Sequence, residues 1–341
     1  MVTGGLFEVA GIDHYRIDGV EEMEPFLMTV VSDTDLWMFV SSTGALTAGR
    51  VDADHAVFPY ETDDRIHRAA GLVGPLTLIA RTVDGVRQLW QPFAPRPAEG
   101  ARRSIAKSVL GDRLVFEEHR PDWSLTFRAT WAPSDVHGWV RTSELLDTAG
   151  ASAATYEVLD GLLDVMPAGV DAHTEQIRSN LVDAYKRSET GPWGTVAVYS
   201  VEALITDRAE PAEALTANVV WSTGFDGAEL DLDAHAVDDM LAGRPRSVTR
   251  LLTGRPGAYL LRGEVSVPTS GSVSWTIVSD VALGPADVVR VVDQVAADDV
   301  SERVARDIEL GSTRLAALLE AADGFQTTAD PIADAHHLSN V

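Results

Sequence analysis

The chain has 341 residues, no cysteine and a formal net charge of −25, and 45% of its residues are hydrophobic. This length predicts two structural units, or one large β unit with an appendage. Without cysteine there are no disulfides, thiolate nucleophiles or cysteine zinc sites, and the acidic balance disfavours nucleic acid and membrane surfaces as partners. No apolar run approaches the about 18 residues of a membrane span, and the N-terminus lacks a signal-peptide pattern, so the sequence predicts a cytoplasmic protein.

An alternation with a period of two dominates the chain up to residue 284. In residues 123–131 one face carries Trp123, Leu125, Phe127, Ala129 and Trp131, and the other carries Ser124, Thr126, Arg128 and Thr130. This pattern is typical of a half-buried antiparallel strand. Further β-branched or aromatic runs lie at 36–40, 76–79, 195–199, 218–221, 259–267 and 273–277. We expect well over about ten strands joined by local turns, and therefore two large antiparallel sheets packed face to face in a mainly β fold.

Two regions interrupt the strand pattern with helical spacing. The first is predicted over residues 172–188, where Asp171 is a suitable N-cap. Ile177, Leu181 and Tyr185 follow at four-residue spacing on one face, so we expect this helix to lie against a sheet. The second begins at Pro285, a residue suited to a first helical turn.

Behind Pro285, an apolar stripe is formed by Val288, Val291, Val292 and Val295. A further helix is predicted from about residue 301 to Gly324, and its apolar side comprises Val304, Ile308, Leu315, Leu318 and Leu319. Gly311 is expected to be its weak point. The predicted division is therefore a β-sandwich at 1–284 and a helical extension at 285–341. The stripe implies a partner surface for the extension, because an apolar face needs to be covered.

Residues 59–67, PYETDDRIH, concentrate polar groups in a predicted loop. Adjacent Tyr, Asp and Arg side chains offer a stacking face with paired donors and acceptors, which favours a sugar-facing loop. Trp193, in the turn Gly-Pro-Trp-Gly, is an expected exposed stacking platform. No HExxH or comparable spacing supports a metal site. The candidate carbohydrate-binding residues are Arg50, Tyr60, Asp63, Asp64, Arg65, His67 and Trp193.

Other carboxylates are candidate acid–base groups. Glu117 and His119 share a strand face, which is most simply interpreted as an exposed edge. Asp160 and Asp164 are close enough in sequence to suggest the carboxylate pair of glycoside cleavage, which needs separations of about 5 Å or roughly 6.5–9.5 Å. Asp160-Gly161 at a strand end is more typical of a turn. With no GxSxG, GxGxxG or phosphate loop, no catalytic residue and no cofactor is predicted.

Several segments resemble the beginning of large bacterial cellobiose-phosphorylase-like proteins, which are related to glycoside hydrolase family 94. These segments are 36–50, 58–67, 115–118, 125–128, 157–170 and 336–341. The resemblance implies a β-supersandwich of galactose-mutarotase type, then a helical linker, then an (α/α)6 barrel that carries the catalytic acid and the phosphate site. Neither the catalytic acid nor the phosphate site of that barrel is expected in residues 1–341. Because residues 60–67 do not match characterised phosphorylases, cellobiose is not predicted as the substrate.

The resemblance thus implies the front part of a glycoside phosphorylase or hydrolase. Its expected roles are to brace the catalytic barrel, to contribute to binding of an oligosaccharide or other sugar ligand, and to form a homodimer. Two alternatives stay open: a free-standing carbohydrate-binding module, and a mutarotase-like sugar epimerase. The epimerase would need a histidine and a carboxylate converging in an open cleft.

Overall fold

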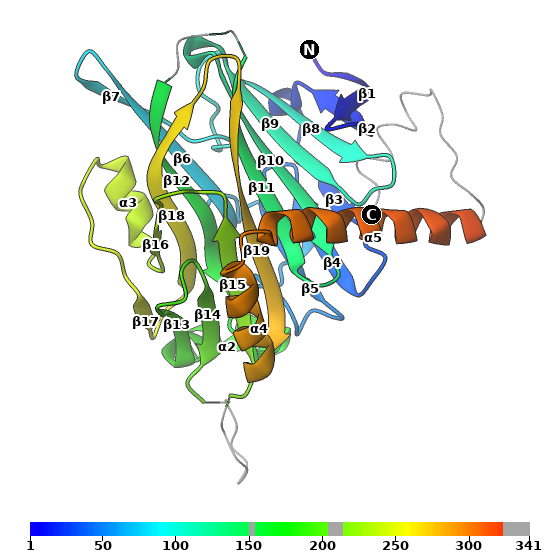
Figure 1. The fold of residues 1–341 in the computed structure, drawn as a ribbon, viewed down its shortest axis with the longest axis vertical. Helices are drawn as coiled ribbons and strands as arrows, with labels where there is room; N and C mark the ends of the chain where they lie inside the picture. Colours follow the sequence, from blue (N-terminus) through cyan, green and yellow to red (C-terminus); the bar gives the residue numbers. More distant parts are fainter. Residues whose placement is uncertain (149, 151–153, 204–213, 323–341) are drawn as a thin grey trace.

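The computed structural model describes residues 1–148, 150, 154–203 and 214–322, and within these ranges it leaves aside the side chains of Asp63, Asp64 and Ser179. Among the described residues, no helix combines the length and apolar character that a membrane span requires. Large antiparallel sheets make up most of the fold and two helices follow them towards the C-terminus (Figure 1). The predicted mainly β sandwich with a C-terminal helical extension is therefore confirmed, whereas the tail from 323 to 341, including the segment 336–341, lies outside the described residues.

The largest sheet has eleven strands in the order β1-β2-β8-β9-β10-β11-β19-β15-β14-β13-β17. In that order they are β1 (Thr3–Val9), β2 (Ile12–Asp18), β8 (Arg102–Ser108), β9 (Leu114–Arg120), β10 (Leu125–Ser134), β11 (Gly138–Asp147), β19 (Ser272–Leu283), β15 (Ala217–Thr223), β14 (Ala197–Val201), β13 (Lys186–Thr190) and β17 (Leu251–Thr253). Short 3-10 turns at Val20–Glu22 and Pro121–Trp123 follow β2 and β9. Gly138 starts β11 with a φ of 92°, and a Cβ there would lie 2.3 Å from the carbonyl oxygen of Ser279, so β11 needs glycine to approach β19.

Two smaller sheets form the second layer. The five-stranded sheet has the order β16 (Glu229–Asp231), β18 (Gly257–Val267), β12 (Ala154–Val165), β6 (Gly74–Val83) and β7 (Val86–Trp90). The three-stranded sheet has the order β3 (Leu27–Val30), β4 (Leu36–Ser41) and β5 (Leu46–Arg50). The main hydrophobic core takes side chains from all three sheets, so it lies between the eleven-stranded sheet and these two.

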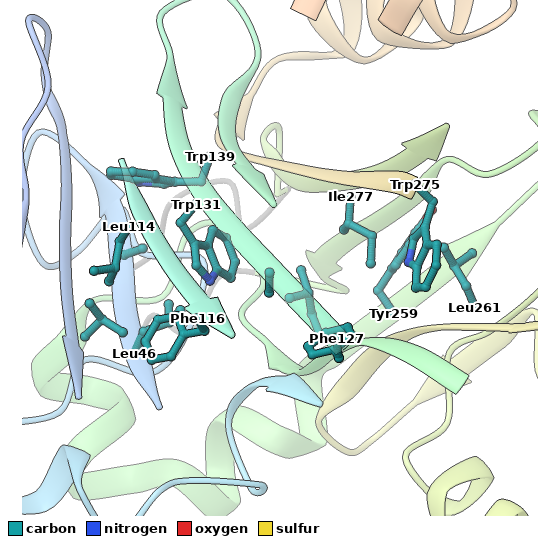
Figure 2. Close-up of a cluster of buried hydrophobic side chains, with 14 of the residues drawn as sticks. Leu46, Leu114, Phe116, Phe127, Trp131, Trp139, Tyr259, Leu261, Trp275 and Ile277 are labelled. Atoms are coloured by element: carbon teal, nitrogen blue, oxygen red, sulfur yellow. The ribbon is translucent and has the colours of Figure 1, made fainter. Parts of the chain in front are cut away.

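Figure 2 shows how this core is built from strands distant in sequence. Phe127 and Trp131 of β10 point into it from the large sheet, and Tyr259 of β18 and Leu46 of β5 enter from the second layer. The alternation predicted for residues 123–131 is confirmed, because its five apolar side chains are all buried. Trp123, however, closes the 3-10 turn, and the strand itself starts at Leu125.

A buried ion pair joins the two layers. Asp160 of β12 is 0% exposed, and its two carboxylate oxygens each lie 2.9 Å from Nη1 of Arg141 on β11. The same carboxylate accepts hydrogen bonds from Thr77 of β6 at 2.5 Å, Ser143 of β11 at 2.9 Å and the indole of Trp275 on β19 at 2.6 Å. The expectation that Asp160 belongs to a turn is wrong, because Asp160 and Gly161 both lie within β12.

Helix α2 (Ala172–Tyr185) begins as predicted, with the Asp171 carboxylate accepting from the backbone N–H of Thr174 at 2.7 Å. Its predicted packing face is wrong, because Ile177 is 58% exposed and Leu181 is also exposed. Val182 is the fully buried residue instead, and it packs in a small apolar cluster with Met166 and Val170, which follow β12, and with Val201 of β14 (Ala197–Val201). Helix α3 (His235–Leu241) covers the outer face of the five-stranded sheet.

Helices α4 (Pro285–Val295) and α5 (Val300–Ala322) pack on the outer face of the large sheet, where α5 crosses the strands (Figure 1). The Val288-to-Val295 stripe contacts a cluster containing Val219 and Trp221. It is thus covered by this chain's own sheet, which removes the reason for inferring a missing partner surface from it. The remaining helix predictions fail in part: Gly311 is a buried contact point in an unbroken helix, and Leu318 is 57% exposed.

Candidate functional site

Four charged side chains form a row across the outer face of the large sheet. They are Arg16 on β2, Glu117 on β9, Arg128 on β10 and Glu144 on β11, and we call this row the charge ladder. Arg128 Nη2 lies 2.8 Å from Glu117 Oε2, and Arg128 Nη1 lies 3.1 Å from Glu144 Oε2. Arg16 Nη2 lies 3.1 Å from Glu117 Oε1. Each acidic group therefore meets an arginine, and no charge in the row is left without an opposite neighbour.

Strand register produces this row. Arg128 stands directly opposite Glu117 on one neighbouring strand and opposite Glu144 on the other. Such directly opposed positions have the short separation at which opposite charges stabilise a sheet. Between Arg16 and Glu117, β8 carries Ala106 and Ser104, whose short side chains leave room for the arginine to reach across.

A large open cleft of about 1010 Å³ lies on this face beside Arg16 and Glu117. His119 and Thr126 also line it, and the imidazole Nδ1 of His119 is 3.0 Å from the Thr126 hydroxyl. The charged lining residues are Arg16, Arg102, Arg103, Asp18, Glu21, Glu22 and Glu117. Positively and negatively charged side chains line the cleft in similar number, although the chain as a whole is strongly acidic. This lining favours a neutral, polar ligand over an ion of either sign.

A second cleft of about 430 Å³ lies on the same face and is lined by the other two members of the ladder, Arg128 and Glu144. Ile308 of α5 contributes to its wall, so the helix borders this cleft. The ion pair between Glu117 and Arg128 thus stands between the larger and the smaller cleft. The two together form a polar surface over the middle strands of the sheet.

The predicted sugar-binding residues lie elsewhere. Tyr60 meets the Trp37 ring edge-on with 5.9 Å between the ring centroids, and His67 Nδ1 lies 2.7 Å from the hydroxyl of Ser41. Arg65 lies in the short helix α1 (Asp63–Ile66) and points into solvent, 3.9 Å from Glu61. The side chains of Asp63 and Asp64 lie outside what the structure describes.

Arg50 and Trp193 do not join that segment. Arg50 donates to Asp280 at 2.7 Å, to Asp35 at 2.9 Å and to the carbonyl oxygen of Asp135 at 2.6 Å, so its guanidinium is occupied by contacts within the chain. Trp193 is 37% exposed in its turn, as expected. None of the candidate side chains that the structure describes lines the larger or the smaller cleft. Their binding of sugar stays a prediction.

Two interpretations of the acidic residues are corrected. Glu117 and His119 do not lie on an exposed edge, because β9 is an interior strand between β8 and β10. Asp160 and Asp164 do not form a pair, since Asp160 faces the sandwich interior while Asp164 lies 3.8 Å from Lys186 beside α2. Burial raises the pKa of Asp164. The glycosidase-type carboxylate pair is therefore excluded for these two residues.

No family model matches the chain, and no curated protein sequence matches it. Among the solved structures that do match is a bacterial glucoamylase complexed with acarbose, with 6% identity and a TM-score of 0.42 over 85% of this chain and 37% of that one. Another is the heparan sulfate lyase HepC from Pedobacter heparinus, with 9% identity and a TM-score of 0.36 over 76% of this chain and 35% of that one. A protein from Klebsiella pneumoniae named as a candidate aldose 1-epimerase has 9% identity and a TM-score of 0.34, over 87% of this chain and 95% of that one.

The chain therefore spans about a third of the length of the glucoamylase and the lyase. At these identities and TM-scores, the chemistry of the site has to be judged from its own residues.

Proposed function

We propose that this chain is the carbohydrate-binding β-sandwich part of a carbohydrate-active enzyme, and that the larger cleft beside the charge ladder holds the sugar. The observation that carries the proposal is an open cleft of about 1010 Å³ whose lining mixes arginine, carboxylate, histidine and hydroxyl groups. A sugar hydroxyl both donates and accepts hydrogen bonds, so it needs neighbouring donors and acceptors at one place. Paired arginine and carboxylate groups supply both.

The ladder supports this proposal by its rigidity. Arg16 and Arg128 both hold Glu117, so its carboxylate has a fixed direction before any ligand arrives. A preformed polar site loses less side-chain entropy on binding than a flexible one. The sequence resemblance to cellobiose-phosphorylase-like proteins points to the same ligand class. The proposed partners remain an (α/α)6 catalytic domain and a second copy of the chain, with the exposed Leu310 of α5 as a contact point.

Calorimetric titration with neutral oligosaccharides tests the site. We expect the unmodified chain to bind, and His119→Ala to lower the affinity about tenfold, as for loss of one hydrogen-bonding group. Trp193→Ala is the matched comparison, because Trp193 represents the site predicted from sequence and lies outside the larger cleft. If Trp193→Ala removed binding and His119→Ala left it intact, the site would lie in the predicted turn. No heat of binding across a broad panel would refute carbohydrate binding itself.

A second candidate function is interconversion of sugar anomers. Glu117 and His119 lie on one face of β9 and both line the larger cleft, which places a carboxylate and an imidazole at the same site. General acid–base catalysis at an anomeric centre requires such a pair. Polarimetry of freshly dissolved α-glucose would test it: the chain should accelerate the change in rotation, and Glu117→Gln should return the rate to that of buffer. An unaccelerated rate with the unmodified chain would exclude this activity for glucose.

A further inference from the structure

Two residues that line the smaller cleft carry buried polar atoms without a hydrogen-bond partner. It lies between the β1–β2 turn, the middle strands of the large sheet and α5, which crosses them (Figure 1). His14 and Arg113 line it together with the ladder residues Arg128 and Glu144. Its apolar wall includes Val140 and Ile308, Ile308 being supplied by α5. The cleft thus combines charged groups with a hydrophobic side.

His14 offers an acceptor in this cleft. The residue is 1% exposed, and its Nδ1 lies 2.8 Å from the carbonyl oxygen of Ile12. A carbonyl oxygen can only accept, so Nδ1 carries the hydrogen and Nε2 carries a lone pair. Nε2 is buried and has no hydrogen-bond partner. Burial also lowers the pKa of His14, which keeps the imidazole neutral and Nε2 an acceptor.

Arg113 offers a donor in the same cleft. Its Nη2 donates to Glu309 of α5 at 2.7 Å and to the hydroxyl of Ser312 at 3.2 Å. Its Nε is buried and makes no hydrogen bond, although Oδ2 of Asp112 lies 4.0 Å away. Buried polar atoms are nearly always hydrogen-bonded in native proteins, so an acceptor and a donor unsatisfied in one cleft indicate a polar ligand group there.

From these atoms we infer that the smaller cleft is a second sugar subsite, and that the ligand is an oligosaccharide which spans the charge ladder with one residue on each side. This inference rests on the proposed function. Both nitrogens are buried in the ligand-free structure, so a hydroxyl that donates to His14 Nε2 and accepts from Arg113 Nε has to displace the side chains that cover them. The C–H face of a sugar ring can pack on Ile308, which is partly exposed in the wall of the cleft. The volume of about 430 Å³ lies at the small end of the range for small-molecule sites, which suits one ring.

The charge of the cleft selects a neutral ring. Glu144 lines the smaller cleft and pairs with Arg128, so the positive charge of that arginine is already balanced. A uronic acid or a sugar phosphate would bring an additional negative charge beside Glu144 and would need a free cation. A neutral hexose residue meets no such repulsion.

Calorimetric titration with glucose and with α-1,4- and β-1,4-linked glucose disaccharides to hexasaccharides tests the inference. We expect the unmodified chain to bind an oligosaccharide at least about tenfold more tightly than glucose, the effect of adding a hydrogen-bonded ring. Ile308→Trp fills the smaller cleft from α5 and should reduce that affinity about tenfold, to the level of the shorter ligand. Leu318→Trp makes the same kind of change on the exposed side of the same helix and should leave the affinity unchanged.

His14→Phe keeps a ring of similar shape without the acceptor, and it should weaken oligosaccharide binding about as much as Ile308→Trp. Should the phenylalanine variant fail to fold, the Ile308→Trp and Leu318→Trp pair still decides the outcome. If His119→Ala weakens binding while Ile308→Trp does not, the second subsite is refuted and the proposed function stands. If the unmodified chain binds none of these sugars, the proposed function and the subsite are both refuted.

Discussion

Replacing Asp160 by asparagine should be among the most damaging single changes in this chain. The side chain keeps its shape, but the negative charge is lost while Arg141, 2% exposed, remains buried beside it. The carboxylate also accepts from Thr77, Ser143 and Trp275. In asparagine one of the two oxygens becomes an NH2 group, which can only donate and would then face other donors.

The expected cost follows from this geometry. Removing one partner of a buried ion pair typically lowers the free energy of unfolding by about 3–5 kcal/mol, because the other charge stays buried without compensation. The donors that lose their acceptor add to the cost, so we expect a value towards the upper end of that range. The double variant Arg141→Met/Asp160→Asn removes the stranded charge as well. Its cost should therefore be clearly smaller than the sum of the two single costs.

Urea denaturation followed by tryptophan fluorescence would measure these free energies. Glu144→Gln is the matched control, because Glu144 belongs to an ion pair with Arg128 that stays in contact with water, its side chains being 23% and 21% exposed, and should cost about 1 kcal/mol or less. A cost for Asp160→Asn no larger than that of Glu144→Gln would refute the reasoning. Strict additivity in the double variant would show that the two buried charges do not stabilise one another.

Three further outcomes can be checked by denaturation. Burial lowers the pKa of Lys107 to about 8, so between about pH 8 and its ordinary pKa of 10.5 the unfolded chain binds more protons and stability rises with pH. Relative to Lys107→Met, the unmodified chain should therefore gain about 3 kcal/mol from pH 7 to pH 10.5, and parallel pH profiles would contradict this. Asp171→Ala removes the α2 cap and should lower the free energy of unfolding by about 1 kcal/mol. An unchanged urea midpoint would show that the cap does not stabilise the fold. Gly161→Ala would place a Cβ 1.8 Å from the carbonyl oxygen of Tyr259 and should lower the free energy of unfolding by about 3 kcal/mol or more. Gly5→Ala is the control and should be nearly neutral, because a Cβ at Gly5 would have nothing within 4 Å. Equal melting temperatures for the two variants would count against the close approach of β12 and β18.

Local patterns in the sequence were sufficient for many of the strands, for their faces and for the starts of helices α2 and α4. The alternation at 123–131 identified which side chains enter the core, because successive residues of a strand point to opposite faces whatever lies beside them. Asp171 could be recognised as a cap because its partner, the backbone N–H of Thr174, is three residues away. Both features depend on neighbours within one segment.

The charge ladder could be predicted only in part, because the sequence indicated the faces of its residues but not their pairing. Arg128 was assigned to the polar face of its strand, and Glu117 and His119 to a shared face, but nothing local indicated that Arg128 and Glu117 stand opposite one another. A one-residue difference in register would have placed them on different faces. The local pattern also did not indicate that β9 is an interior strand, which is why Glu117 and His119 were assigned to an edge.

The class of fold and the core-facing side of the strands could therefore be read from local patterns alone. The contacts between distant segments became known only from the three-dimensional fold: Asp160 with Arg141, Arg16 with Glu117, and the valine stripe of α4 with the sheet of its own chain. The periodicity of a segment records only how that segment divides its surface between water and the interior. The identity of the partner depends on the order and register of strands far apart in the chain, and no single segment encodes these.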